Sequence, residues 1–96
     1  MKTLNLTPSS NSLEGIYTKD STVLCFCDAT DSDLTVYLPD AEDVVFKFKK
    51  INDANKIYLR SRFNKIDNSE FVTLENENEC KTLEYDGNNW WITSSH

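Results

Sequence analysis

Apolar and polar residues alternate along much of this chain with the period of two that is typical of half-buried β-strands. The alternation is cleanest in residues 44–50, where valine and phenylalanine side chains share one face and lysines occupy the other. Residues 56–63 show the same pattern, and no stretch keeps a 3.6-residue period for three helical turns. Threonine, valine, isoleucine and aromatic residues are frequent, whereas alanine is scarce. The sequence therefore predicts strands rather than helices.

The strands are short, and each is closed by residues that favour turns. Pro39 ends one of them because proline has no amide hydrogen for a sheet, and Asp86-Gly87 is typical of a tight hairpin. This pattern predicts an all-β domain without a linker, built of short antiparallel strands and hairpins in a small β-sandwich or β-prism-like module. We expect strands at residues 15–18, 22–28, 34–38, 44–50, 56–63, 71–74, 80–85 and 90–94, with a short element at residues 66–68.

Charge excludes two classes of partner. The chain has 96 residues, with 10 basic and 16 acidic side chains and a net charge of −6. A protein that binds nucleic acid or an anionic membrane normally presents a basic face, so we expect neither partner. No apolar run approaches the roughly 20 residues that span a bilayer, and residues 1–12 lack the apolar segment of a signal peptide. We expect a soluble, unprocessed chain.

The small size of the chain favours assembly. A single domain of this length buries only about 60 to 70% of its unfolded surface, and small β proteins often complete their core with partner chains. Eight apolar side chains are expected to pack in the core or between the chains of an oligomer: Val36, Leu38, Phe46, Phe48, Ile57, Leu59, Leu83 and Trp90.

The three cysteines are expected to be free thiols. Cys25 and Cys27 lie two apart on one strand face, with Cα atoms roughly 6.5 to 7 Å apart, which strains a direct disulfide. An immunoglobulin-like bridge from Cys25 to Cys80 is disfavoured because both tryptophans follow Cys80. Zinc would need more cysteine or histidine ligands than this chain offers, since its single histidine is His96. We expect no metal site.

One strand carries a polar and aromatic stripe. Tyr58, Arg60 and Arg62 alternate onto the same face and have the chemistry to bind a carboxylate or phosphate. Such a stripe is more often a solvated sheet face, or it pairs across strands with acids such as Glu75 or Glu84. Both interpretations remain open at the level of the sequence.

Acidic residues offer no recognisable chemistry. Glu75, Glu77 and Glu79, with Asp31 and Asp33 elsewhere, carry the oxygen ligands that calcium prefers. They lack the glycine-bearing spacing of a calcium loop and have no basic partners nearby in the sequence, so we expect a solvated loop. The chain has no internal histidine, no nucleophile in a recognisable turn and no glycine-rich phosphate loop. We therefore expect no catalytic residues, no cofactor and no enzymatic activity.

Six sequence blocks occur in an order that resembles a β module of bacteriophage tail fibres, tail spikes and head fibres. The blocks are IYTKDSTVLCFCDAT (residues 16–30), LTVYLPDA (34–41), FKFKK (46–50), KIYL (56–59), KIDN (65–68) and LEYDGNNWWI (83–92). The resemblance spans roughly four-fifths of the chain, from Gly15 to Thr93. That module usually carries glycines where this chain has Asp43 or Val44 and Asn68. Asparagine tolerates the left-handed conformation that such a glycine adopts.

The resemblance implies a structural protein of a virion that assembles as a homotrimer. We expect residues 15–96 to form the trimeric fibre module and residues 1–14 to be an arm that is disordered or anchors the protein to the capsid or another virion protein. Leu4 and Leu6 are the candidate anchoring residues. The chain starts at methionine and ends just past the module, which favours a short head fibre or capsid decoration protein, made in the host cytoplasm, over a slice of a tail fibre.

Two alternatives are retained. In the first alternative, the chain is a tail-fibre or receptor-binding segment. In the second, it is a monomeric carbohydrate-binding β-sandwich that stacks on a sugar with Trp90 or Trp91. Trp90 and Trp91 point to opposite faces if they lie in a strand, so one of them is exposed or covered by a neighbouring chain. Trp91 is the candidate contact to a glycan of the host surface.

Overall fold

The computed structural model describes residues 1–15, 17–40, 43–61 and 64–95. These residues form no helix, and so they contain no helix that could cross a membrane. The prediction of an all-β chain is confirmed. The described strands are β1 (Lys2–Leu6), β2 (Thr22–Cys27), β3 (Leu34–Leu38), β4 (Val45–Lys50), β5 (Ile57–Ser61), β6 (Phe71–Leu74), β7 (Cys80–Tyr85) and β8 (Trp90–Ser95).

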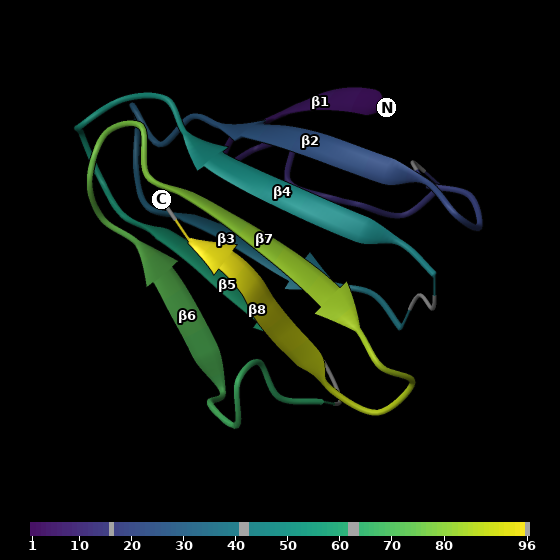
Figure 1. Ribbon diagram of the computed structural model, residues 1–96. Coiled ribbons are helices and arrows are strands. Elements are labelled where there is room, and N and C mark those ends of the chain that lie inside the picture. Colours follow the sequence, from purple (N-terminus) through teal and green to yellow (C-terminus); the bar gives the residue numbers. More distant parts are fainter. Residues whose placement is uncertain (16, 41–42, 62–63, 96) are drawn as a thin grey trace.

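The described strands pack as two sheets in a compact sandwich (Figure 1). Sheet A has the order β1-β2-β4-β7-β8, and sheet B has the order β3-β5-β6. Both sheets are mixed: β1, β2 and β4 run parallel to one another, as do β3 and β5, whereas β5–β6, β4–β7 and β7–β8 are antiparallel. The expectation of antiparallel strands is therefore correct only in part. Between β2 and β4, and between β3 and β5, the chain passes through the other sheet, and each of these pairs is parallel.

The alternation seen in the sequence sets the two faces of each sheet. In β2 and β4, every second side chain points inward and is buried, including Cys25, Phe46 and Phe48, while the intervening side chains remain half-exposed. Val36 and Leu59, which pair across β3 and β5 in sheet B, also point inward and are buried. The inward faces of the two sheets thus form one hydrophobic core.

The first 14 residues belong to this sandwich. β1 pairs with β2, and Leu6 and Leu13 are 1% and 2% exposed within the core. The connection from β1 to β2 runs beside the edge of sheet B, where the Asn11 side-chain amide donates to the carbonyl of Thr35 at 2.7 Å. A disordered N-terminal arm is therefore not what the structure shows, and the described part of residues 15–18 is turn and coil rather than the predicted strand.

All eight side chains expected at the core or between chains are at most 1% exposed in the single chain: Val36, Leu38, Phe46, Phe48, Ile57, Leu59, Leu83 and Trp90. Their burial needs no second chain. Contact between copies would therefore use an outer surface of the sandwich.

Candidate functional site

Trp90 is the centre of a buried cluster at one end of the sandwich. Its side chain is fully buried, and its ring centroid lies 5.7 Å from that of Phe46 and 5.2 Å from that of Tyr85. The indole nitrogen donates to the carbonyl oxygen of Pro39 at 3.2 Å. This bond ties the start of β8 to the end of β3, so Trp90 joins the two sheets.

The backbone of Trp90 is held by the loop before β6. Its amide donates to the Lys65 carbonyl at 2.9 Å, and its carbonyl accepts from the Asp67 amide at 3.0 Å. The Asp67 carboxylate then accepts from the Ile92 amide at 2.9 Å, and the Asn89 side chain accepts from the Lys65 amide at 3.1 Å. These bonds cover the edge of β8 where the strand begins.

The turn between β7 and β8 is organised by Asp86. One carboxylate oxygen accepts from the amides of Asn88 and Asn89 at 2.8 and 2.7 Å, and the other accepts from the indole nitrogen of Trp91 at 2.8 Å. The Asn89 amide and then the Trp91 indole lower the pKa of Asp86 below its usual value. Gly87 has a φ of 95°, which explains the glycine in this turn.

Five described residues other than glycine have a left-handed backbone conformation: Asp20, Asp43, Asp67, Asn68 and Asn78. Asp43 has a φ of 60° and Asn68 a φ of 65°. Both conformations are ones that glycine adopts without strain and that aspartate and asparagine tolerate better than most residues.

Comparison of the chain with protein-family models, with characterised proteins and with solved structures gave no match.

The two tryptophans take different places. Trp90 is buried and offers no stacking surface, which removes it as a glycan platform. Trp91 is half-buried on the outer face of sheet A, opposite Glu84 on β7. The same face carries the half-buried apolar side chains of Leu24, Phe26 and Val45. We call these four side chains, Leu24, Phe26, Val45 and Trp91, the apolar patch of sheet A. The strand register places Lys47, Lys49 and Glu84 among them.

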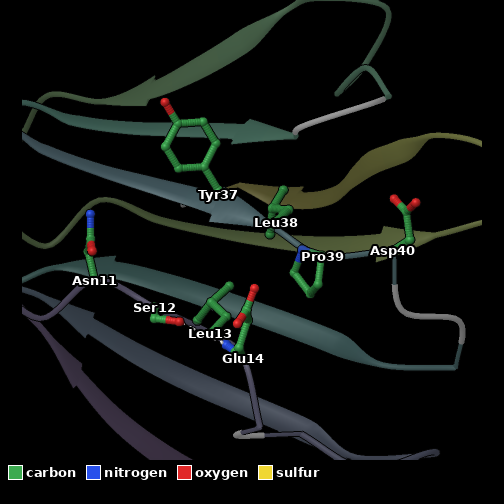
Figure 2. Close-up of a pocket in the computed structure, with 8 residues that line it drawn as sticks. All are labelled: Asn11, Ser12, Leu13, Glu14, Tyr37, Leu38, Pro39 and Asp40. Atoms are coloured by element: carbon green, nitrogen blue, oxygen red, sulfur yellow. Dashed lines mark hydrogen bonds between the residues drawn. The ribbon is translucent and has the colours of Figure 1, made fainter.

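A pocket of about 330 Å³ lies between residues 11–14 and the end of β3 (Figure 2). Leu13 and Leu38 contribute buried side chains, and the exposed carboxylates of Glu14 and Asp40 also line it. Asp40 is already engaged, because its carboxylate accepts from the Asn64 side-chain amide at 2.6 Å. The eight described lining residues include no histidine, cysteine or lysine. The Ser12 hydroxyl in this lining accepts a hydrogen bond from the Glu14 amide at 3.2 Å.

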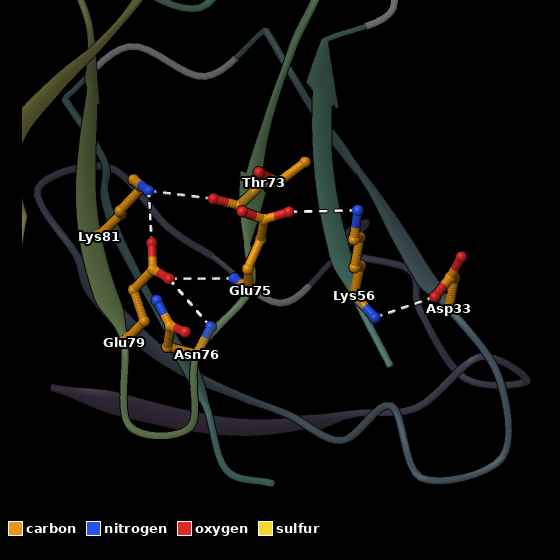
Figure 3. Close-up of polar contacts among 7 residues, drawn as sticks. All are labelled: Asp33, Lys56, Thr73, Glu75, Asn76, Glu79 and Lys81. Atoms are coloured by element: carbon orange, nitrogen blue, oxygen red, sulfur yellow. Dashed lines mark hydrogen bonds and ion pairs between the residues drawn. The ribbon is translucent and has the colours of Figure 1, made fainter. Parts of the chain in front are cut away.

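The acidic tract before β7 is a closed, ion-paired turn (Figure 3). Glu75 pairs with Lys56 at 3.2 Å, and Glu79 pairs with Lys81 at 2.6 Å. Glu79 also accepts from the amides of Glu75 and Asn76 at 3.0 and 3.2 Å. The expectation that these carboxylates lack basic partners is wrong for Glu75 and Glu79. Lys56 is the residue just before β5, and Lys81 lies on β7, two residues after Glu79.

The same contacts set the ionisation of Glu79. Burial raises its pKa, but the hydrogen bonds from Lys81 and the two amides lower it more, so the pKa lies below its usual value. Of the other calcium candidates, Asp33 accepts from the Lys56 amide at 2.9 Å. Within the described residues, no group of three or more acidic, histidine or cysteine side chains is arranged to hold a metal ion.

Lys50 is a buried cation that the sequence did not single out. It is fully buried at the end of β4, and its ammonium donates to the Asn52 carbonyl at 2.5 Å. The Asn52 side chain in turn donates to Asp28 at 2.6 Å, and Asp28 also accepts from Thr30. The Thr30 hydroxyl and amide lower the pKa of Asp28 below its usual value. Hydrogen bonds among Lys50, Asn52, Asp28 and Thr30 thus join the loop after β2 to the loop after β4.

The polar and aromatic stripe forms the outer face of sheet B. Tyr58 and Arg60 point outward from β5, and Arg62 lies outside the described residues. The structure adds Tyr37 and Phe71, which are 46% and 44% exposed on the neighbouring strands. The sequence offered a signal for both, since each lies at a polar position of its strand's alternation.

The cysteines are free thiols, as predicted. Burial raises the pKa of Cys25 to about 12 and that of Cys27 further still. Both thiols therefore pack as small apolar groups, while Cys80 is half-buried on β7.

Proposed function

We propose that the chain is a structural protein of a bacteriophage virion, a short homotrimeric head fibre or capsid decoration protein. One observation carries the proposal: four of the blocks that resemble the phage module meet at Trp90. Pro39, Phe46, the Lys65–Asp67 turn and Tyr85 come from different blocks and all contact this residue. The motif residues thus hold the fold together, which is the role expected in a structural module.

The left-handed turns at Asp43 and Asn68 give further support. A chain that replaced the module's glycines without needing their geometry would show ordinary φ values there. Both positions keep the left-handed conformation instead.

The trimer contact is proposed at the apolar patch of sheet A. The single chain already encloses its core, so assembly has to bury an outer face. Leu24, Phe26 and Val45 alternate there with the aliphatic stems of Lys47 and Lys49, and all five are half-buried. Such a surface can be covered by a copy of itself around an axis.

Molecular mass tests this assembly. Light scattering of the wild-type chain is expected to give roughly 33 kDa, three times the 11.1 kDa of one chain. Phe26→Asp is expected to give one-chain mass with an unchanged far-ultraviolet circular dichroism spectrum, because a buried carboxylate in the contact is costly. The matched control, Phe71→Asp on the outer face of sheet B, should remain trimeric. A wild-type protein that stays at one-chain mass at all concentrations rejects the trimer.

Two further measurements complete the test. Cys80 lies in register with Lys49 and Phe26 across sheet A, so its thiol should react more slowly in the trimer than in Phe26→Asp. Electron cryo-microscopy of the intact particle should place the chain on the head. Density on the tail would replace the head-fibre assignment by a tail fibre, and absence from the particle would reject a virion role.

A further inference from the structure

The outer face of sheet B carries an exposed aromatic surface, and Arg60 is the one cation among its described outward positions. Strand register aligns Tyr37, Arg60 and Phe71 in one row across β3, β5 and β6. The Arg60 guanidinium lies over the Phe71 ring, 5.5 Å from its centroid, and Tyr58 packs its ring against Phe71 at 5.7 Å. We call Tyr37, Tyr58, Arg60 and Phe71 the aromatic face.

Arg60 lacks an acidic partner in the part of the chain that the structure describes. No described carboxylate forms an ion pair with it, although the chain has 16 acidic residues. The described outward positions of sheet B contain no acid at all: Thr35, Tyr37, Tyr58, Arg60, Phe71 and Thr73. Glu75 at the border is already paired with Lys56. The ring of Phe71 therefore positions a guanidinium whose charge is available to a carboxylate.

The size of the face suits a small ligand. Its six outward side chains fall far short of the roughly 20 to 30 residues that each side of a stable protein interface contributes. Tyr37 and Phe71 stand two strands apart, about 10 Å, which is comparable with the length of a disaccharide. Aromatic rings on a flat sheet offer apolar surfaces to the C–H faces of sugars, while Arg60 offers hydrogen-bond donors.

We propose that the aromatic face binds a carboxylated oligosaccharide, with Arg60 holding the carboxylate and Tyr37 and Phe71 stacking on the neighbouring sugar rings. The pocket beside Tyr37 orients this ligand. Glu14 and Asp40 line that pocket, and Figure 2 shows the Tyr37 ring directed away from Glu14. The ligand's negative charge is thus repelled on one side of Tyr37 and attracted on the other.

The negative charge of the whole protein does not prevent this binding. Screening at physiological salt acts over about 8 Å, so contact with Arg60 outweighs the more distant exposed carboxylates. The inference assumes neither a trimer nor a virion, because the face belongs to one chain.

Paired oligosaccharides test the proposal. The full chain is titrated with trigalacturonate and its neutral galactose counterpart, and with sialyllactose and lactose, by calorimetry or nuclear magnetic resonance. At least one acidic member should bind about tenfold or more tightly than its neutral partner, as expected for a charge-assisted hydrogen bond. Arg60→Gln should remove that difference, and Tyr37→Ala should weaken binding about three- to tenfold.

Controls separate this face from other surfaces. Ile51→Ala removes an apolar side chain that is 42% exposed outside the aromatic face and should leave binding unchanged, as should Trp91→Ala. Equal binding of acidic and neutral sugars, unchanged binding in Arg60→Gln, or no binding of either acidic sugar overturns the proposal. Loss of binding in Trp91→Ala alone would place the ligand on sheet A instead.

Discussion

Trp90 and Trp91 are adjacent in sequence and differ in what they do for the molecule. Trp90 fills the end of the core and donates its indole hydrogen across to sheet B, whereas Trp91 is half-buried on the outer face and is tied to the turn at Asp86. The period of two in a strand is the cause, because it sends neighbouring side chains to opposite faces. The two tryptophans are therefore expected to respond differently to substitution.

Truncating Trp90 is expected to be among the most damaging changes. Trp90→Ala should lower the free energy of unfolding by about 3 to 5 kcal/mol, since it leaves a cavity beside Phe46 and removes the donor to Pro39. Trp90→Phe should cost less but still leave the Pro39 carbonyl without that donor. Urea denaturation measures both. The control, Trp91→Ala, should change the free energy far less, and an equal effect at the two positions would contradict the cluster.

At the scale of single residues, alternation was sufficient to place the core residues of the predicted strands. Phe46, Phe48, Ile57 and Leu59 could be placed because each lies two positions from another apolar residue. Lys50 could not be, since it continues the buried face of β4 and its charge is compensated only by a carbonyl in the next turn. Burial of a lysine depends on such a partner, which no local pattern encodes.

The strands differ in how well the sequence predicts them. β3 was predicted with its observed bounds because strict alternation ends at Pro39. β1 was missed because Leu4 and Leu6 are its only apolar residues and give no run to recognise. The parallel pairing of β2 with β4 was also missed, because a strand's partner depends on contacts between distant segments. Local signals thus located strands without giving their order.

The turn from β6 to β7 should weaken as acid protonates Glu79. Its pKa lies below the ordinary value of 4.5, so its contribution to stability is present above about pH 4.5 and is lost as the pH falls below that value. Glu79→Gln should lower the free energy of unfolding by about 1 to 2 kcal/mol at pH 7, because the side chain is only 16% exposed and bonds Lys81. The loss should shrink toward pH 3.

Urea denaturation at pH 7, 4 and 3 measures this change. Glu77→Gln is the control, since Glu77 is exposed in the same turn and should shift stability by no more than about 0.5 kcal/mol. A difference between wild type and Glu79→Gln that stays constant across the pH range would show that the carboxylate does not act through its charge.

At the scale of the whole molecule, the connection between β1 and β2 packs against sheet B and contributes to the core. Sheet A has more strands than sheet B, and residues 11–14 lie beside β3 at the edge of sheet B. This is why Leu13 is buried although it lies in no strand. Of the two candidate anchoring residues, Leu6 is buried in the core and Leu4 is half-buried, and an anchoring role for them stays a prediction.

Substitutions in this N-terminal segment should therefore act on folding. Leu6→Ala and Leu13→Ala are each expected to lower the free energy of unfolding by about 2 to 5 kcal/mol, the usual cost of a cavity in a core. Thr3→Ala, at an exposed position of β1, should stay within about 0.5 kcal/mol of wild type. Thermal and urea unfolding provide the comparison. Unchanged stability in both leucine variants would instead support an arm that serves only for attachment.

The two outer faces have separate proposed tasks. The apolar patch of sheet A is proposed for contact between copies, and the aromatic face of sheet B for a sugar. Because the faces lie on opposite sides of the sandwich, a trimer formed through one would present three copies of the other (Figure 1). Weak binding at each copy would then add up on a surface that carries many ligands.

Trp90 comes later in the sequence than the residues at the end of β3 and in β4 that it contacts, which bears on how the protein is made. Its contacts reach back to Pro39, Phe46 and Lys65, which a ribosome adds well before it reaches β8. Until β8 emerges, the nascent chain has both apolar inner faces but not the residue that joins them. Those faces are exposed to other nascent chains and to chaperones during that interval. Translation thus delivers the closing residue of the sandwich among the last.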